Sequence, residues 1–349
     1  MLLGFLVKER HGIMDEVKWL LVGAGDIARR RVAPALVRAA NSRLVAVCDT
    51  CRERAEELAG AHGVGTVYGD YAQALAETEA DVVYLATPQS THIELSLQAL
   101  AAGKHLLCEK PLGVNSAECL RLLRAARQSD RMTSCSNYRR LSEQCKLTAA
   151  MLERGDIGPL VGGWGIYSTG FYNPGKHPVR QALGMSRIKE LGYYLIDIVH
   201  NFYGMPVSVV AQTGQLHPET MNDVEELATV VLKFPSGAIF TIIFNCITQG
   251  TRHEMEFFGE RGRIQWPEWP PHGNGPVVRL TRAGTESFPV HTDENYHLPM
   301  IEDYVDAMLT SRAPLCTLES ATKTEVITDA IFRSIASGRV ESIVWGEVR

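Results

Sequence analysis

The first 136 residues alternate between short apolar runs and segments with helical periodicity. The apolar runs stand at 17–23, 44–49, 81–88 and 105–111, and helical patterns such as the one over 27–40 follow them. Strands that alternate with helices of this length form right-handed parallel crossovers. The pattern therefore predicts an α/β domain over residues 14–136, built on a doubly wound parallel sheet.

Helix starts in this region are marked by short polar residues. Asp70 precedes one helical pattern, and Thr91 and Asn115 each stand three residues before a glutamate. That spacing is typical of a capping box, in which the first side chain accepts a hydrogen bond from a free backbone N–H. We expect side-chain caps at Asp70, Thr91 and Asn115.

From residue 137 the pattern changes. A helical segment at 142–154 precedes a series of β-type runs with short turns, and two amphipathic helices near 298–311 and 319–337 close the chain. The β-type runs lie at 160–169, 207–214, 227–234, 237–247 and 253–266. Sequential strands with short turns favour antiparallel pairing. Residues 137–349 are therefore predicted to form an α+β domain on an open, mostly antiparallel sheet, and residues 1–13 are interpreted as an N-terminal extension or a misplaced start.

The net charge and the length of the apolar segments exclude two classes of partner. The 349 residues carry a formal net charge of −5, which provides no basic field for a nucleic acid. The run Arg29–Arg31 falls in a predicted helix and is interpreted as a solvated helix face. No segment approaches the roughly 20 apolar residues that span a bilayer. We expect neither a nucleic-acid nor a membrane partner.

The cysteines indicate a reducing compartment. Eight are scattered along the chain, which does not resemble a dense secreted disulfide framework. Cys48 and Cys51 form a lone CxxC with no second pair and no clustered histidines, so we expect no metal site. The sequence thus favours a cytoplasmic protein.

A glycine-rich turn joins the first predicted strand to its helix. Gly23, Gly25 and Ala28 form GxGxxA in this position, and Asp49 ends the second strand 21 residues after Ala28. The first glycine permits a tight turn, the second lets the backbone approach a pyrophosphate, and the acid can accept hydrogen bonds from the adenosine ribose. The motif predicts a dinucleotide site. The charge of Asp49 favours NAD over NADP, although Arg52 could partly reverse that preference.

Two further segments lie where parallel strands end, at the edge of the sheet where ligands bind. They are ATPQSTH at 86–92 and CEKP at 108–111. Together with GAGDIA at 23–28, GKHLLCEKP at 103–111 and NYRR at 137–140, they resemble the family of glucose-fructose oxidoreductase, inositol dehydrogenase and rhizopine-catabolism (Gfo/Idh/MocA) proteins over nearly the whole chain. The resemblance implies a Rossmann domain and a larger open sheet whose outer face makes subunit contacts, and so a homodimer or homotetramer.

The resemblance places Lys110 between nicotinamide and substrate. An ammonium there can stabilise a developing alkoxide and exchange a proton. The resemblance also suggests a cis Lys110–Pro111 bond, a nicotinamide-ribose contact for Glu109, and a place at the nucleotide site for His92, for which a structural contact is the alternative. The candidate cofactor-binding residues are Gly23, Gly25, Asp26, Ile27, Ala28, Asp49, Thr87, Pro88, His92, Glu109 and Lys110.

The remaining family signature is altered in this chain. The family's DxGxHxxD stretch matches Glu190, Gly192, Tyr194 and Asp197 in KELGYYLID. Residues 190, 194 and 197 are expected to share a helix face, and a lysine beside Tyr194 is expected to lower the pKa of its phenol. Lys110, Tyr194 and Glu190 are the candidate catalytic residues, with packing as the alternative role of Tyr194, and His200 is expected to be structural. The candidate substrate-binding residues are Lys110, Arg139, Tyr172, Arg187 and Tyr194.

The resemblance and the motifs together predict reversible hydride transfer between a nicotinamide and a hydroxyl-bearing carbon of a sugar, sugar derivative or cyclitol. Two alternatives stay open. One is an enzyme that holds NAD permanently and uses transient sugar oxidation for elimination or glycoside cleavage. The other is a non-catalytic dinucleotide-binding regulator, which the altered acid-base pair would suit.

Overall fold

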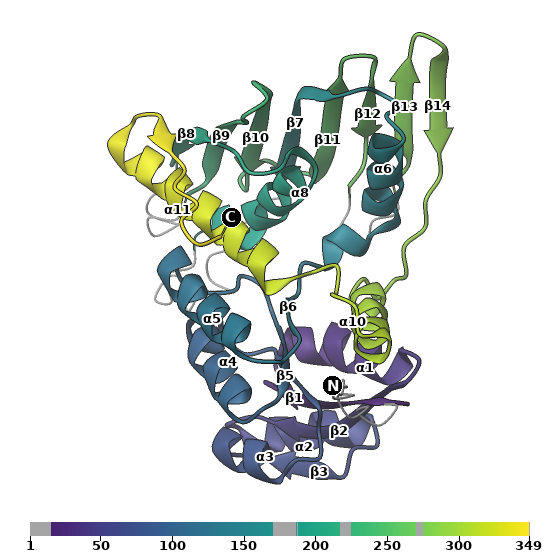
Figure 1. The fold of residues 1–349 in the computed structure, drawn as a ribbon, viewed down its shortest axis with the longest axis vertical. Coiled ribbons are helices and arrows are strands. Elements are labelled where there is room, and N and C mark those ends of the chain that lie inside the picture. Colours follow the sequence, from purple (N-terminus) through teal and green to yellow (C-terminus); the bar gives the residue numbers. More distant parts are fainter. Residues whose placement is uncertain (1–14, 170–185, 187, 217–224, 270–274, 349) are drawn as a thin grey trace, which may run out of the picture.

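The protein has two sheets with helices between and beside them (Figure 1). The structure is a computed structural model, and it describes residues 15–169, 186, 188–216, 225–269 and 275–348. The N-terminal sheet lies at one end of the molecule, and the larger C-terminal sheet lies at the other.

The N-terminal sheet is the predicted doubly wound parallel sheet. Its six strands run in the order β3-β2-β1-β4-β5-β6, and each neighbouring pair is parallel. The strands are β1 (Val17–Val22), β2 (Ser42–Cys48), β3 (Thr66–Tyr68), β4 (Val82–Leu85), β5 (His105–Cys108) and β6 (Thr133–Cys135). The order reverses between β1 and β4, which is where such sheets bind dinucleotides.

The helices of this domain begin largely as predicted. Asp70 caps α3 by accepting from Gln73 N, and Asn115 caps α5 by accepting from Glu118 N. The cap predicted at Thr91 is wrong, because its side chain accepts no hydrogen bond from the first helical turn. The hydroxyl lies instead between the Pro88 carbonyl and the Thr87 hydroxyl, at 2.8 Å from each. The helical elements are η1 (Ala28–Val32, a π-helix), α1 (Ala33–Arg38), α2 (Arg52–Ala61), α3 (Tyr71–Glu77), α4 (His92–Ala101) and α5 (Ser116–Gln128).

The C-terminal sheet has nine strands and is mixed. Their order is β14-β13-β12-β11-β7-β10-β9-β8-β15, and the β7–β10 pair is parallel while the others are antiparallel. The predicted run 253–266 forms a hairpin of two strands, and β13, β14 and β15 were not foreseen. The strands are β7 (Leu160–Ser168), β8 (Ser208–Gly214), β9 (Leu227–Lys233), β10 (Ile239–Asn245), β11 (Arg252–Gly259), β12 (Gly262–Trp266), β13 (Val277–Thr281), β14 (Gly284–Phe288) and β15 (Glu341–Ser342).

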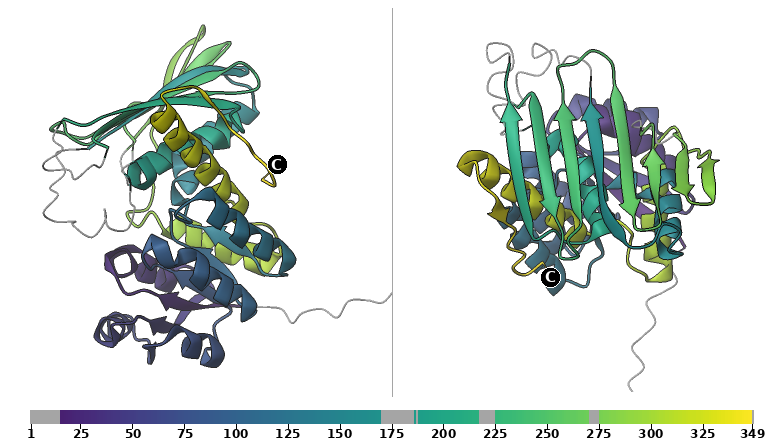
Figure 2. Two further views of the ribbon diagram at one scale, coloured as in Figure 1. Left: turned by 90° about the vertical axis from the view of Figure 1, so that its left-hand side faces the viewer. Right: turned by 90° about the horizontal axis from the view of Figure 1, so that it is seen from above.

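The helices of the C-terminal half lie on the inner side of this sheet, facing the nucleotide domain (Figure 2). Helix α10 reaches the N-terminal sheet, where Tyr304 packs on Trp19 at 5.3 Å between ring centroids and donates to the Leu106 and Met132 carbonyls. The domain boundary between residues 136 and 137 remains a prediction. Helix α10 follows this boundary in sequence but packs on the N-terminal sheet that precedes it. These elements are η3 (Tyr138–Leu141), α6 (Glu143–Glu153), η5 (Ile188–Gly192, a π-helix), α8 (Tyr193–Tyr203), α10 (Leu298–Thr310) and α11 (Leu318–Ser337).

All eight cysteines are free thiols, and all but Cys51 are buried. Among the described residues, no group of acidic, histidine and cysteine side chains is arranged to hold a metal ion. Within the same ranges, no helix combines the length and the apolar character needed to cross a membrane.

Candidate active site

The glycine turn after β1 has the shape that a dinucleotide needs. Gly23 has φ of +95°, and a Cβ there would lie 2.6 Å from the Ala86 carbonyl oxygen, so only glycine fits. At Gly25 a Cβ would meet no atom within 4 Å. The first helical hydrogen bond runs from Arg29 N to the Gly25 carbonyl. Residues 26–28 therefore lie in the first helical turn, whose N–H groups have no intrahelical partner and favour an anion. The open space and these donors fit a pyrophosphate.

Asp49 lies directly beside this turn. One carboxylate oxygen accepts from Ala24 N at 2.7 Å, and the other accepts from Cys51 N at 2.8 Å and from Arg54 Nη2 at 3.0 Å. The prediction that Arg52 would modify this site is not supported, because Arg52 turns away to pair with Glu56. Arg54 is the arginine that contacts the acid.

The loop after β4 is tied to the loop after β5 by His92. The ring is 1% exposed, and its two nitrogens lie 2.9 Å from the Thr87 and Pro111 carbonyls. Burial lowers its pKa, which favours the neutral ring. These contacts support the structural alternative for His92 over direct contact with a nucleotide. Thr87 is half-buried and Pro88 is exposed at the end of β4.

Glu109 is turned into the protein interior. Its Oε1 accepts from the Tyr84 hydroxyl at 2.8 Å, from Ser136 Oγ at 3.1 Å and from His297 Nε2 at 3.0 Å, and Oε2 accepts from its neighbour's backbone N–H. Burial alone would raise its pKa, but the His297 and Tyr84 bonds outweigh burial and hold the pKa near 2. Glu109 therefore anchors the segment that carries Lys110, and its contact with a ribose remains a prediction.

The structure brings Lys110, Glu190 and Tyr194 together, but the contact from Glu190 comes from its backbone carbonyl, so an orienting role of its carboxylate remains a prediction. The Lys110–Pro111 bond is cis, and Lys110 Nζ donates to the Glu190 carbonyl at 3.3 Å. The same Nζ lies 4.4 Å from the centroid of the Tyr194 ring. Lys110 and Glu190, which are 80 positions apart in sequence, are thus joined at the carboxyl end of β5.

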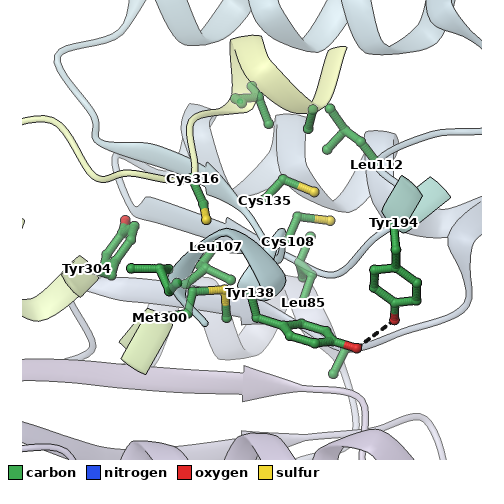
Figure 3. Packing of buried hydrophobic residues seen from close by; sticks show 14 of the residues in the cluster. Leu85, Leu107, Cys108, Leu112, Cys135, Tyr138, Tyr194, Met300, Tyr304 and Cys316 are labelled. Atoms are coloured by element: carbon green, nitrogen blue, oxygen red, sulfur yellow. Dashed lines mark hydrogen bonds between the residues drawn. The ribbon is translucent and has the colours of Figure 1, made fainter. Parts of the chain in front are cut away.

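The Tyr194 hydroxyl accepts a hydrogen bond from the Tyr138 hydroxyl at 2.7 Å (Figure 3). The ring is buried, and burial raises the phenol pKa, while nearby Arg139 and the Tyr138 bond act in the opposite direction. The expected lowering of this pKa is therefore wrong, because the loss of hydration outweighs the neighbouring cations. Tyr194 is a neutral phenol at physiological pH.

Arg139 lies on the same ring. Its Cζ is 4.2 Å from the Tyr194 centroid and 4.2 Å from that of Trp269. The side chain is 4% exposed, and neither Nε nor Nη1 has a hydrogen-bond partner. The other two predicted substrate residues, Tyr172 and Arg187, lie outside the described residues.

Asp197 does not share the environment of Tyr194. Its carboxylate accepts from Asn137 Nδ2 at 2.5 Å and from Arg140 at 2.7 and 2.8 Å. Glu190 lies on the π-helix η5 and the other two residues lie on α8, so the common face expected for residues 190, 194 and 197 remains a prediction. His200 contacts the Thr324 hydroxyl and Arg140, so it is the structural histidine that the sequence predicted.

Tyr138 is the site residue that sequence reasoning missed. It stacks on Tyr296 at 4.5 Å and lies 4.6 Å from His297 between ring centroids. The motif NYRR contains it, but nothing in that motif indicates a partner 56 residues away.

Comparisons with known proteins agree with this geometry. Residues 17–137 match the model of an oxidoreductase family with an NAD-binding Rossmann fold, and residues 146–265 match the Gfo/Idh/MocA C-terminal domain. An uncharacterized oxidoreductase of Rhizobium meliloti is 28% identical over 95% of this chain and 100% of its own length. The D-glucoside 3-dehydrogenase of Escherichia coli is 23% identical over 92% of this chain and 96% of its own length.

A solved structure has the same fold. The oxidoreductase from Agrobacterium radiobacter, in complex with NAD+, L-tartaric acid and magnesium, is 21% identical and aligns with a TM-score of 0.86 over 94% of this chain and 98% of its own. The glycine turn and the cis Lys110–Pro111 bond agree with the two family matches. Because both family models match it, the chain belongs to the Gfo/Idh/MocA family of NAD-binding oxidoreductases.

Proposed function

We propose that this protein transfers a hydride between a nicotinamide and a hydroxyl-bearing carbon of a sugar, sugar derivative or cyclitol. The observation that carries the proposal is the contact of Lys110 Nζ with the Tyr194 ring and the Glu190 carbonyl, at the end of β5. The similarity to a D-glucoside 3-dehydrogenase supports the substrate class.

When bound, the nicotinamide supplies or accepts the hydride, and the protein's own residues handle the proton. In the oxidative direction the neutral amine form of Lys110 takes the proton of the substrate hydroxyl and becomes an ammonium, and in the reductive direction that ammonium returns the proton to the developing alkoxide. Because Tyr138 donates to the Tyr194 oxygen, the proton of Tyr194 itself can point to the substrate oxygen. Tyr194 then orients that oxygen as a neutral donor, and Glu190 orients Lys110 through its carbonyl.

NAD is the preferred cofactor in this proposal. The turn at Gly25 leaves room for the pyrophosphate, and Asp49 directly follows β2, where the adenosine ribose is expected. A carboxylate there repels a 2′-phosphate, while Arg54 at 3.0 Å partly offsets its charge. NADP is therefore also accepted, with a lower kcat/KM than NAD.

The proposal includes a homodimer or homotetramer formed through the C-terminal sheet. In the part of the chain that the structure describes, no helix lies in front of the outer face of this sheet (Figure 2). On this face Ile239 is 49% and Ile243 is 37% exposed, on the interior strand β10. Exposed apolar side chains on a broad sheet are typical of subunit interfaces. Ile243→Asp should yield monomers by light scattering, and a wild-type protein that is already monomeric would remove this part of the proposal.

We also propose a cytoplasmic location. The eight cysteines are free thiols in the fold, and such thiols persist in a reducing compartment. Fractionation of the native host with a cytoplasmic marker enzyme tests this location, and recovery with secreted proteins would contradict it.

The test of the reaction is a panel of sugars and cyclitols with NAD and with NADP, followed by the absorbance of reduced nicotinamide. We expect turnover with at least one compound and a higher kcat/KM with NAD. A protein that binds NAD and oxidises or reduces nothing would favour the regulator instead. NAD that stays bound through gel filtration would favour the enzyme that retains its cofactor.

A further inference from the structure

Arg139 is a buried cation without a counter-charge. The side chain is 4% exposed, no ion pair reaches it from the described residues, and its Nε and Nη1 have no hydrogen-bond partner. Arg140, the next residue, is the opposite case, since Asp197 binds it through two oxygens. Buried polar groups in native proteins are nearly always satisfied, so donors left unmet at a candidate active site call for a ligand.

The groups around Arg139 are neutral. Its Cζ lies over the rings of Tyr194 and Trp269 at 4.2 Å each, and 5.7 Å from the ring of Tyr167. His253 stacks on Tyr167 at 3.9 Å, and burial together with the Arg139 charge lowers its pKa to about 4, so it is uncharged at neutral pH. Aromatic faces attract a guanidinium but do not accept hydrogen bonds from all of its donors.

The two segments that follow Tyr167 and Trp269 in sequence contain no acidic residue. Tyr167 and Trp269 precede the segments 170–185 and 270–274, and neither segment contains an aspartate or a glutamate. A ligand or a remote part of the chain can supply the missing negative charge.

Arg139 and Lys110 share one aromatic ring. Lys110 Nζ is 4.4 Å and Arg139 Cζ is 4.2 Å from the Tyr194 centroid. These two distances put Lys110 Nζ and Arg139 Cζ at most 8.6 Å apart, a separation that a sugar-sized molecule can span. Two cations around one neutral phenol also favour an anionic substrate electrostatically.

We propose that Arg139 binds a carboxylate of the substrate, so that the protein acts on sugar acids, namely polyhydroxy carboxylates such as uronates and aldonates. The inference rests on the proposed function and adds the substrate's charge to it. A carboxylate supplies both the missing counter-charge and two acceptor oxygens for guanidinium donors. Because the guanidinium is buried, a neutral sugar leaves these donors unpaired, and that penalty makes the site selective.

The test compares matched pairs that differ only in one carbon's oxidation state. Glucose is compared with glucuronate and galactose with galacturonate, each with NAD. We expect kcat/KM for the acid to exceed that for the neutral sugar by about tenfold or more. In Arg139→Gln the acid-to-neutral ratio should collapse toward one, and Arg139→Lys should restore part of it. Arg154→Gln, which removes an exposed charge at the end of α6, is the matched control and should keep the wild-type ratio.

Binding is measured separately from turnover, so the inference can fail independently of the proposed function. Calorimetric titration of the NAD-loaded wild-type protein should detect glucuronate more tightly than glucose, and Arg139→Gln should lose this difference. A wild-type preference for the neutral sugar, or an equal loss of both activities in Arg139→Gln, would overturn the inference and leave Arg139 as a group that positions Tyr194. Weaker NAD binding in Arg139→Gln would assign the arginine to the cofactor's phosphates and would also overturn it.

Discussion

The hydroxyl of Tyr138 donates to the hydroxyl of Tyr194 across 2.7 Å, and both rings are buried. The Tyr194 oxygen thus accepts the hydrogen bond from Tyr138, and the Tyr194 hydroxyl proton can be donated to another group. Figure 3 shows the two phenols meeting at their oxygens beside the packed apolar cluster.

Tyr138→Phe should lower kcat about tenfold, because it removes one hydrogen bond to the oxygen of the candidate proton donor. Tyr194→Phe should lower kcat more, by about 10²-fold. The double variant should be no slower than Tyr194→Phe alone, since Tyr138 acts through Tyr194. Steady-state kinetics of the three variants check this, and multiplicative losses would show that the two phenols act separately.

Gly23 and Gly25 form a matched pair in the dinucleotide turn. Gly23→Ala should destabilise the fold by about 1–3 kcal/mol, because φ is +95° and the new Cβ would lie 2.6 Å from the Ala86 carbonyl oxygen. Gly25→Ala should leave the melting temperature unchanged and weaken NAD binding, because the space that the Cβ enters is open to the ligand. Thermal unfolding and fluorescence titration with NAD distinguish the two effects. A Gly25→Ala variant with normal NAD affinity would contradict the placement of the pyrophosphate.

Asp49→Ser should shift cofactor preference toward NADP. The change removes a carboxylate next to Ala24 N and leaves Arg54 free for a 2′-phosphate. We expect the ratio of kcat/KM for NADP to that for NAD to rise about tenfold or more, which corresponds to about 1.4 kcal/mol. Adding Arg54→Ala should reverse much of the gain, whereas adding Arg52→Ala should not.

Glu325 on α11 should make stability depend on pH. It is fully buried, and burial, with Asp329 and Glu118 nearby, raises its pKa to about 8 although Lys189 opposes the shift. For a raised folded-state pKa, the stabilising contribution is complete below the unfolded value near 4.3 and is lost as pH rises through about 8. The wild-type melting temperature should therefore fall between about pH 5 and about pH 9 by more than that of Glu325→Gln. Parallel melting curves for the two proteins across this range would contradict the raised pKa.

Much of the fold could be predicted from sequence because its signals are local. The alternation of apolar runs and helices identified β1, β2, β4 and β5, and the glycine turn fixed where the sheet binds its ligand. The strand β14 is short, and its side chains are mostly polar and exposed, so its pattern carries little of the hydrophobic signal that identifies a strand.

Site residues could be predicted from sequence only where they belong to a recognisable motif. Lys110 and Tyr194 lie in recognisable segments, but the hydrogen bond from His297 to Glu109 joins residues 188 positions apart. The pKa of Tyr194 could not be predicted for a related reason. The direction in which the Tyr194 pKa shifts depends on burial by distant segments rather than on the lysine and arginine that the motifs reveal.

The central claim is that Lys110 Nζ handles the substrate proton, and Lys110→Ala tests it most directly. We expect kcat to fall by about 10³-fold or more, while the dissociation constant for NAD changes little because the glycine turn remains intact. Lys146→Ala, an exposed lysine on α6, is the matched control and should retain wild-type kcat. Unchanged turnover in Lys110→Ala, measured on a substrate that the wild-type protein oxidises, would contradict the account.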